Sequence, residues 1–425
     1  MDTYANTLLI AIPIFFISVL LEALYGNWIK DQKHNFMDTI SSLSSGITNL
    51  SWDVLGIAFF LFTYENVYQY IMIFNIELDS LTTSNQVSLY IVAFICIDFA
   101  SYCHHYLKHS VNLFWNQHII HHSSEEFNLA CALRQSITNN FGVNALFLIP
   151  AALCGVPPEV VQIILPLHLF AQFWYHTRHI GKLGFLEYII VTPSQHRVHH
   201  AINPEYIDKN LGAIFCFWDR AFGTFQEELD EVPCVFGTLK PVRTWNPVLI
   251  NFIHLWGLTQ DAWNTRKWND KLKLWFMPTG WRPSDVSLKF PKKIVTDVYN
   301  QKKYSPQYTF KHKLMTVFQF MCINIMSFLF LYNFSDIDLF SQIAYVFLIF
   351  STIFGFTSMM DGYKWGFVFE ISRSIIGLII IIYFSQNLML EKDLYFTLGF
   401  GFYFLVTFLI TILIGPSLPK RVLLQ

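Results

Sequence analysis

Residues 394–414 read LYFTLGFGFYFLVTFLITILI, a run without a single charged side chain. A helix that crosses the hydrocarbon core of a bilayer needs about 20 mostly apolar residues. The 425-residue chain around this run is 53% hydrophobic and only 14% charged, whereas soluble domains carry about 25% charged residues. So few charges cannot cover the surface of a soluble protein of this size. The composition therefore predicts an integral membrane protein and excludes an intrinsically disordered chain.

Seven segments have the length and composition of a membrane span. These predicted spans cover residues 8–24, 55–74, 87–103, 315–334, 339–357, 367–384 and 394–414. The first has no basic leader and no small-residue cleavage site after it, so we expect an anchor rather than a signal peptide. An eighth apolar stretch, 141–174, is broken by Gly155, Pro157 and Pro158. This break predicts a re-entrant helical hairpin rather than one long helix.

The spans predict an all-α fold, a polytopic membrane helical bundle organised in four regions. We expect N-terminal transmembrane helices at 1–85, a histidine-box catalytic domain at 86–230 that contains the hairpin at 141–174, a cytosolic or interfacial segment at 231–312, and C-terminal transmembrane helices at 313–425.

The charged residues between the spans predict the orientation of the chain. Lys30, Lys108 and most basic residues of 176–312 fall on one side, and connections that carry acids, such as Asp79 and Asp336, fall on the other. By the positive-inside rule, the N-terminus lies outside, while the C-terminus and the large polar segment lie in the cytosol. The net charge of −2 leaves no basic excess for a nucleic-acid partner.

Histidines are concentrated in short segments with a regular spacing. Six of the 15 lie within residues 104–122 and five within 176–200. His105 and His109 are four apart, and the pattern HxxHH occurs at 118–122 and again at 196–200. On a helix such positions share one face, so their imidazoles can converge on a metal ion at about 2.0–2.1 Å. Three such boxes exceed the needs of one tetrahedral ion, and they predict a cytosolic site for two metal ions.

The last box also carries a helix start, with Thr192 as N-cap, proline at the first helical position and glutamine at N3. Isolated histidines have an ordinary explanation. We interpret His34, His254 and His312 as surface or core residues. His168 lies in the apolar stretch, and it is either a packing residue or a ligand or gate.

At these boxes the chain resembles the fatty acid hydroxylase (sterol desaturase) superfamily of membrane di-iron enzymes. The resemblance covers about residues 90–285 and includes WNQHIIHHSSE at 115–125, NLACALRQS at 128–136 and LEYIIVTPSQHRVHH at 186–200. The strings around the boxes point to the subfamily that acts on alkylglycerols. Carried over residue by residue, the resemblance implies nine metal ligands: His105, His109, His118, His121, His122, His176, His196, His199 and His200.

Three positions depart from the superfamily pattern. Tyr106 stands where arginine is common, and His104 offers a second register for the first box, although only His105 pairs with His109 at i+4. His179 could replace or supplement His176.

Carboxylates near the boxes are expected to orient imidazoles and to offset positive charge. Asp98 is the first candidate, because it lies seven residues before His105 within an otherwise apolar span. Glu125 and Asp219 complete the predicted catalytic set, although an ordinary cap or surface pair explains each of them equally well. Ordinary caps and surface pairs explain the remaining candidates equally well: Glu126, Glu187, Asp208 and Asn210.

The resemblance implies two iron ions, O2 and a lipid substrate that enters from the bilayer. Iron supplies redox chemistry that zinc lacks. For an alkylglycerol, oxygen is inserted at the carbon next to the ether oxygen, and the resulting hemiacetal releases a fatty aldehyde. Tetrahydrobiopterin as reductant is implied by the resemblance alone, and an electron-donor protein is the alternative.

Two other functions fit the same sequence. A sterol or fatty acyl hydroxylase or desaturase with another electron donor keeps the enzyme class and changes the substrate. A membrane metal transporter or sensor would place its ligands along a path near the bilayer midplane, whereas the histidine boxes flank span ends on one side.

Two features outside the boxes have alternative explanations. Glu370 and Arg373 lie three apart in the span at 367–384, where snorkelling to the cytosolic end is favoured over an intramembrane pair. Six tryptophans lie among lysines and arginines in 245–281. They suit either a segment in the lipid headgroup layer or plain packing beneath the catalytic domain.

Overall fold

The computed structural model describes residues 2–29, 32, 34–140, 143–387 and 394–415. Within these residues the chain forms helices and three isolated bridges but no β-strand, which confirms the all-α prediction. The long helices are α1 (Asp2–Ile29), α2 (Phe36–Ile71), α3 (Thr83–Ser110), α7 (Pro158–Phe170), α10 (Pro247–Asn264), α13 (Phe310–Tyr332), α14 (Leu339–Met360), α15 (Lys364–Asn387) and α16 (Leu394–Ile414).

Short helices connect the long ones. The α-helical ones are α4 (Asn112–Trp115), α5 (Ile119–His122), α6 (Ile149–Leu153), α8 (Pro193–His200), α9 (Phe217–Phe222), α11 (Trp268–Lys273) and α12 (Ser284–Lys289). The 3₁₀ helices are η1 (Leu78–Ser80), η2 (Cys131–Leu133), η3 (Ile137–Asn140), η4 (Val143–Leu148) and η5 (Gly184–Tyr188).

Six helices in the described part of the chain are long and apolar enough to cross a membrane. They lie in α1, α3 and α13 to α16, and each overlaps one of the seven predicted spans. The seventh prediction, 55–74, lies mostly in the second half of α2, where the side chains of residues 56–62 are outside the part of the chain that the structure describes, so this span stays a prediction. The chain is a multi-pass membrane protein.

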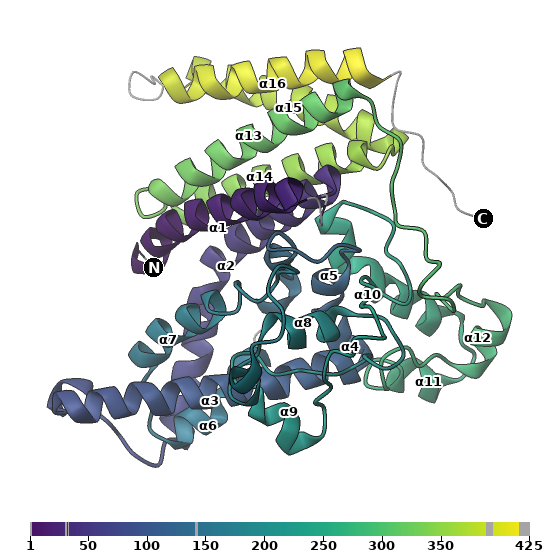
Figure 1. Cartoon of the computed structure of the whole chain (residues 1–425). Helices are drawn as coiled ribbons and strands as arrows, with labels where there is room; N and C mark the ends of the chain where they lie inside the picture. The colour runs from purple at the N-terminus through teal and green to yellow at the C-terminus, as the bar shows by residue number, and fades with distance from the viewer. Residues whose placement is uncertain (1, 30–31, 33, 141–142, 388–393, 416–425) are drawn as a thin grey trace.

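The membrane helices form two packed layers that α2 connects. In Figure 1, α1 and α13 to α16 lie together in the upper part, whereas α3, α6 and α7 lie in the lower part. The first half of α2 contributes Met37 and Ile47 to the upper core, and the second half contributes Tyr64 and Tyr68 to the lower core. A 36-residue helix is about 54 Å long, which is long enough to serve both layers.

The predicted hairpin region contains η4, α6 and α7. The chain turns at Gly155, where the sequence predicts a break, with a φ of +75°. A Cβ atom at this position would lie 2.6 Å from the carbonyl oxygen of Phe74, so glycine permits both the turn and the close approach. Tyr64 donates a hydrogen bond to the Val156 carbonyl at 2.8 Å. These contacts fasten the turn to the end of α2, and re-entry into the bilayer stays a prediction.

The pair in α15 corrects the expectation of snorkelling. Glu370 is 1% exposed and Arg373 8% exposed, and Arg373 donates to both Glu370 carboxylate oxygens, at 3.1 and 2.7 Å. The guanidinium also donates to Thr352 of α14 and to Tyr403 of α16. Because the neighbouring helices supply these acceptors, the arginine has no need to reach the membrane surface. Gly355 of α14 leaves the space that the Glu370 carboxylate occupies.

The segment after the histidine boxes is tied to the membrane bundle at one carboxylate. Asp361, directly after α14, accepts hydrogen bonds from Thr244, from the Trp245 backbone N–H and from the Tyr304 hydroxyl. Trp245 is buried in the upper core, so plain packing describes this tryptophan.

Other tryptophans of the same segment lie on the surface. Trp256, Trp263 and Trp268, of α10 and α11, are each more than half exposed. Exposed tryptophans beside lysines are typical of a surface at the membrane interface, so the headgroup prediction is retained for these three residues.

Candidate metal centre

Nine histidines lie in two adjacent groups whose ring nitrogens point toward one another. The five-histidine group contains His105, His109, His118, His122 and His199, and the four-histidine group contains His121, His176, His196 and His200. Within each group one ligand nitrogen per residue lies within 4.8 Å of all the others. These are the nine histidines that the sequence resemblance singles out. Both groups could hold a metal ion.

Short helices present the second and third boxes. α5 ends with two adjacent histidines that belong to different groups. His121 belongs to the four-histidine group, and His122 belongs to the five-histidine group. α8 begins at Pro193, and the Thr192 side chain accepts a hydrogen bond from the Gln195 N–H, as the sequence predicts. Gln195 does not complete a capping box, because its side chain donates to the Glu187 carbonyl at 2.7 Å.

Distances between ring nitrogens match ligands that share one ion. In the four-histidine group, the Nε2 atom of His200 lies 3.0 Å from those of His121 and His196, and His176 lies 2.8 Å from His196. In the other group, the Nε2 atoms of His105 and His118 are 2.8 Å apart. Ligand nitrogens at 2.0–2.1 Å from one metal ion lie about 2.9–3.4 Å apart.

Hydrogen bonds at Nδ1 fix the orientation of five of the nine rings. In four rings Nδ1 donates to a backbone carbonyl oxygen: His105 to Leu211, His121 to Arg134, His176 to Gln172 and His199 to Lys209. In the fifth ring, His109 Nδ1 donates to the carboxylate of Asp208. A carbonyl oxygen can only accept, so Nδ1 carries the proton and Nε2 keeps a free lone pair. This is the tautomer that binds a metal through Nε2.

Burial keeps the imidazoles in the neutral, metal-binding form. Desolvation, reinforced by neighbouring imidazoles, lowers the pKa of His122, His196 and His200 well below its usual value. Desolvation also lowers the pKa of His121 to about 4. The buried Nε2 atoms of His109, His122 and His199 have no hydrogen-bond partner within the described residues. Unpaired buried nitrogens are costly, and a bound metal ion would satisfy them.

The predicted catalytic carboxylates lie outside the two groups. Asp98 is fully buried and accepts hydrogen bonds from His168, from the backbone N–H groups of Ile214 and Phe215, and from the Trp218 indole. It therefore fixes a backbone turn and not a ring of the nine. The expectation that Asp98 directly contacts an imidazole of the boxes is wrong, because its hydrogen-bond partners are His168 and residues 214–218.

Asp219 acts on the centre through the backbone. Its carboxylate accepts from the N–H groups of Leu211 and Gly212, at 2.6 and 2.8 Å, and the Leu211 carbonyl accepts from His105. Glu125 lies away from the groups, because it accepts from the Tyr304 backbone N–H and from Gln301. Its expected position at the metal centre is wrong.

The weaker candidates divide in the same way. Asp208 contacts the five-histidine group directly, at 2.9 Å from His109 Nδ1. Glu187 accepts from the N-cap residue of α8, and Asn210 donates to the carbonyl oxygens of Gln195 and Gln226. These two residues position α8. Glu126 pairs with Lys303 near the surface.

Six of the 15 histidines lie outside both groups, and three of these are near the boxes or were candidate ligands. His104 stacks on Phe147 and bonds to Gln117, which settles the register of the first box in favour of His105. His168 bonds to Asp98, and His179 packs edge-on against Tyr25.

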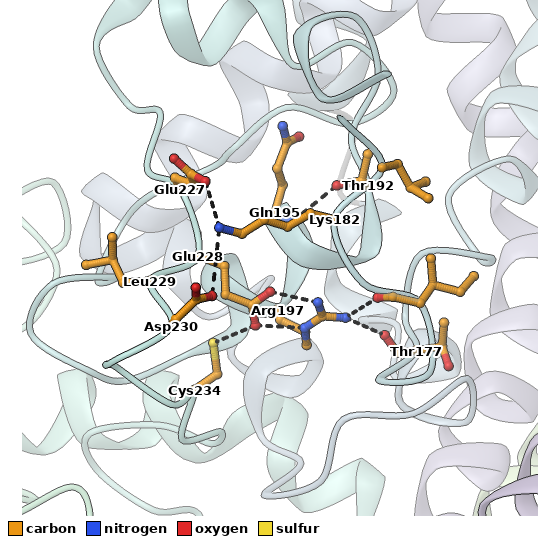
Figure 2. A network of polar contacts seen from close by, with 12 residues as sticks. Thr177, Lys182, Thr192, Gln195, Arg197, Glu227, Glu228, Leu229, Asp230 and Cys234 are labelled. Carbon is orange, nitrogen blue, oxygen red and sulfur yellow. Dashed lines mark hydrogen bonds and ion pairs between the residues drawn. The ribbon is translucent and has the colours of Figure 1, made fainter. Parts of the chain in front are cut away.

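Arg197 is a positioning residue that the histidine pattern did not reveal. Figure 2 shows its guanidinium between Glu228 and the segment that follows His176. It donates twice to the Glu228 carboxylate, at 2.8 and 2.7 Å, and also to the Thr177 and Ile180 carbonyl oxygens. α8 is thereby tied to the chain around His176. An arginine inside a histidine box is the only signal in the sequence.

A cavity of about 650 Å³ leads from the membrane helices to the histidines. His105 and His118 of one group and His121, His176 and His196 of the other contribute to its wall. Its remaining wall is mostly apolar and comes from α1, α2, α3, α13 and residues 132–139, 169–175 and 212–213. A volume of this size is typical of sites for small organic ligands.

Comparison with known proteins places the chain in a family. A sequence model of the fatty acid hydroxylase family matches residues 90–224. Alkylglycerol monooxygenase of Homo sapiens is 35% identical over 308 residues, which cover 72% of this chain and 67% of the relative. The alkylglycerol monooxygenase of Danio rerio is 34% identical over 315 residues, covering 74% of this chain and 68% of the relative. The chain thus spans about two thirds of the length of these two relatives.

The chain is also similar, at lower identity, to an enzyme whose name gives a different lipid. An ornithine lipid hydroxylase of Rhizobium tropici is 28% identical over 135 residues, which cover 32% of this chain and 41% of the relative. No solved structure matches the chain. By the extent of its identity to the monooxygenases and by the family match across its histidine boxes, the chain belongs to the fatty acid hydroxylase family.

Proposed function

We propose that the chain is a di-iron, O2-dependent membrane monooxygenase that hydroxylates the ether-linked carbon of alkylglycerols and so releases a fatty aldehyde. One observation carries the proposal: a single cavity joins the lipid-facing helices to both histidine groups. Similarity to alkylglycerol monooxygenases supports this choice of substrate.

Each histidine group is proposed to hold one iron ion. Nine imidazoles for two ions leave positions open for other ligands if each ion is six-coordinate. Bound iron would supply the redox chemistry with O2 that an unactivated C–H bond requires. The chain supplies rings of fixed orientation, because five Nδ1 atoms are bonded to carbonyl or carboxylate oxygens.

The cavity would admit the lipid sideways from the bilayer. Ile325 and Phe328 of α13 belong to its wall and are also more than half exposed. Leu9 and Phe16 of α1 contribute apolar wall on the other side. An alkyl chain between α1 and α13 would exclude water from the centre, which favours oxidation of the lipid over loss of reducing equivalents.

The proposed reaction balances with an external reductant. One oxygen atom of O2 enters the C–H bond next to the ether oxygen, and the other leaves as water, with two electrons and two protons from the reductant. Tetrahydrobiopterin is the proposed donor, and an electron-donor protein is the alternative. The hemiacetal then breaks its C–O bond to give fatty aldehyde and glycerol. The centre is proposed to face the cytosol, which the distribution of basic residues supports.

Purified protein tests the proposal directly. Iron content is measured by plasma mass spectrometry, and the protein is then given 1-O-hexadecylglycerol, O2 and tetrahydrobiopterin. We expect about two iron ions per chain and release of hexadecanal, with ¹⁸O from ¹⁸O2 in the aldehyde when exchange with water is trapped by rapid reduction. A His200→Ala variant, which removes a ligand of the four-histidine group, is the control and is expected to lose iron and activity.

The alternatives predict other results in this assay. Oxidation of a sterol or an acyl lipid in place of the ether lipid would contradict the substrate assignment. Metal movement across sealed vesicles without O2 consumption would contradict the enzyme assignment.

A further inference from the structure

A polar chamber adjoins the cavity that leads to the histidines. A second cavity of about 250 Å³ shares part of its wall with the larger one. We call the space bordered by this shared wall the polar chamber. Its wall contains Leu169 and eight polar residues: Asn49, Asp53, Ser101, His104, Lys108, Gln135, Asn139 and Gln172. The arm of the cavity between α1 and α13 is apolar by contrast. This division matches a lipid with a small polar head and a long chain.

Lys108 supplies the positive charge of the chamber. It lies in α3, three residues after His105, and its side chain belongs to the wall of both cavities. Within the described residues its ammonium group makes no hydrogen bond or ion pair. An ionisable group inside a membrane helix is costly unless it is paired. Oxygen atoms of a ligand would pair it.

Asn49 and Gln135 supply acceptors on the opposite walls. One amide N–H of each is already used, since Asn49 donates to the Ser136 carbonyl at 3.1 Å and Gln135 to the Ala132 carbonyl at 3.0 Å. Both residues border the cavity, and their amide oxygens accept no hydrogen bond within the described residues. The chamber therefore offers one cationic donor and two amide acceptors. Hydroxyl groups, which donate and accept at once, match this set.

We propose that the polar chamber binds the vicinal diol of the lipid head, with Lys108 donating to a hydroxyl oxygen and Asn49 and Gln135 accepting from the hydroxyl protons. This inference rests on the proposed function for the identity of the lipid. Because the carboxylate of Asp53 borders the same chamber as Lys108, the chamber favours an uncharged diol over a phosphate monoester. His118 and His121, one from each histidine group, border the same cavity.

Binding without turnover tests the proposal. Purified full-length protein, without O2 or reductant, is titrated with three radiolabelled lipids of equal chain length: 1-O-hexadecylglycerol, 1-hexadecanol and 1-O-hexadecylglycerol 3-phosphate. In wild type the diol is expected to bind tightest. In Lys108→Met, of similar length, the preference for diol over alcohol falls about tenfold or more, as expected for one charge-assisted hydrogen bond. The affinity for hexadecanol changes less than twofold.

Two further variants keep the test decisive. Gln135→Met removes one acceptor and is expected to lower the diol preference about threefold or more, whether or not the Lys108 variant folds. Asn333→Leu is the matched control, because Asn333 is not among the residues that line either cavity and donates to the Leu329 carbonyl at the end of α13. It is expected to leave the preference unchanged.

The results decide whether the polar chamber binds the diol of the lipid head. An unchanged diol preference in both the Lys108 and the Gln135 variants overturns the assignment. Tighter binding of the phosphate than of the diol, lost in Lys108→Met, also overturns it in favour of an anionic head. The readout does not depend on turnover, so selective diol binding by a protein that releases no aldehyde would refute the proposed function and leave this site standing.

Discussion

Replacement of Arg197 by methionine tests whether tertiary contacts, and not the histidine pattern alone, hold the last histidine box in place. α8 is only eight residues long, and an isolated helix of that length is unstable in water. The guanidinium makes four hydrogen bonds, two to Glu228 and one each to the carbonyl oxygens of Thr177 and Ile180 (Figure 2). Methionine fills similar space and makes none of them.

The expected loss follows from the burial of the pair. Removal of one partner of a buried ion pair costs about 3–5 kcal/mol. The Arg197 side chain is 10% exposed and that of Glu228 20% exposed, so water can partly solvate the remaining carboxylate. We therefore expect a loss of about 2–3 kcal/mol in the free energy of unfolding. Loss of a group that orients metal ligands typically lowers metal affinity about 10–100-fold.

Figure 2 also contains the matched control. Lys182 pairs with Glu227 at 2.7 Å and lies 4.0 Å from Asp230, but these side chains are exposed. Because exposed pairs contribute little, Lys182→Met is expected to keep the wild-type melting temperature and iron content. Both variants are purified in one detergent, and their iron content and thermal unfolding are measured. Equal iron content and melting temperature in Arg197→Met, Lys182→Met and wild type would refute the positioning role.

Three further results are expected. Acidification of metal-free protein should lower its melting temperature. His121 has a pKa of about 4 in the folded state against 6.5 for the free side chain, so between these pH values unfolding takes up a proton. The stability is therefore full above about pH 6.5 and falls as the pH drops toward 4. A melting temperature that is constant between pH 7.5 and 5 would contradict this. Asp208→Ala removes the acceptor of His109 Nδ1 and should weaken iron binding about 10–100-fold, measured by competition with a chelator, whereas Asp208→Asn retains an acceptor and should lose less. Arg373→Met leaves an unpaired buried carboxylate at Glu370 and should lower the free energy of unfolding by about 3–5 kcal/mol. The double variant with Glu370→Leu should regain part of this loss. A double variant that is less stable than Arg373→Met would refute this account of the pair.

Helix content, six of the spans and the eight histidines of the three boxes could be predicted from the sequence because each depends on local pattern, whereas the inclusion of His176 follows from the family resemblance. Apolar runs of sufficient length become membrane helices regardless of their neighbours. The i, i+3 and i+4 spacings put imidazoles on one helix face before any tertiary contact forms. The assignment of His121 and His122 to different groups could not be predicted, because it depends on the direction of each ring on a helix of one turn.

The carboxylates could not be assigned because their partners are distant in the sequence. Asp98 precedes His105 by two turns of one helix, but its hydrogen-bond partners are His168 and residues 214–218. Glu370 and Arg373 were misjudged for the same reason, since Thr352 and Tyr403 approach the pair from other helices. A sequence of one helix contains no information on which acceptors its neighbours present.

The supports of the two histidine groups form a chain that begins in the membrane. α3 carries His105 and His109 on a long helix, so these two rings share the rigidity of the lower layer. Asp98 of the same helix binds the backbone at 214 and 215, and Asp219 binds that at 211 and 212. Both carboxylates therefore hold the turn whose Leu211 carbonyl orients His105. A carboxylate that contacts none of the nine imidazoles can thus determine the orientation of the His105 ring, because it positions the backbone carbonyl to which that ring donates.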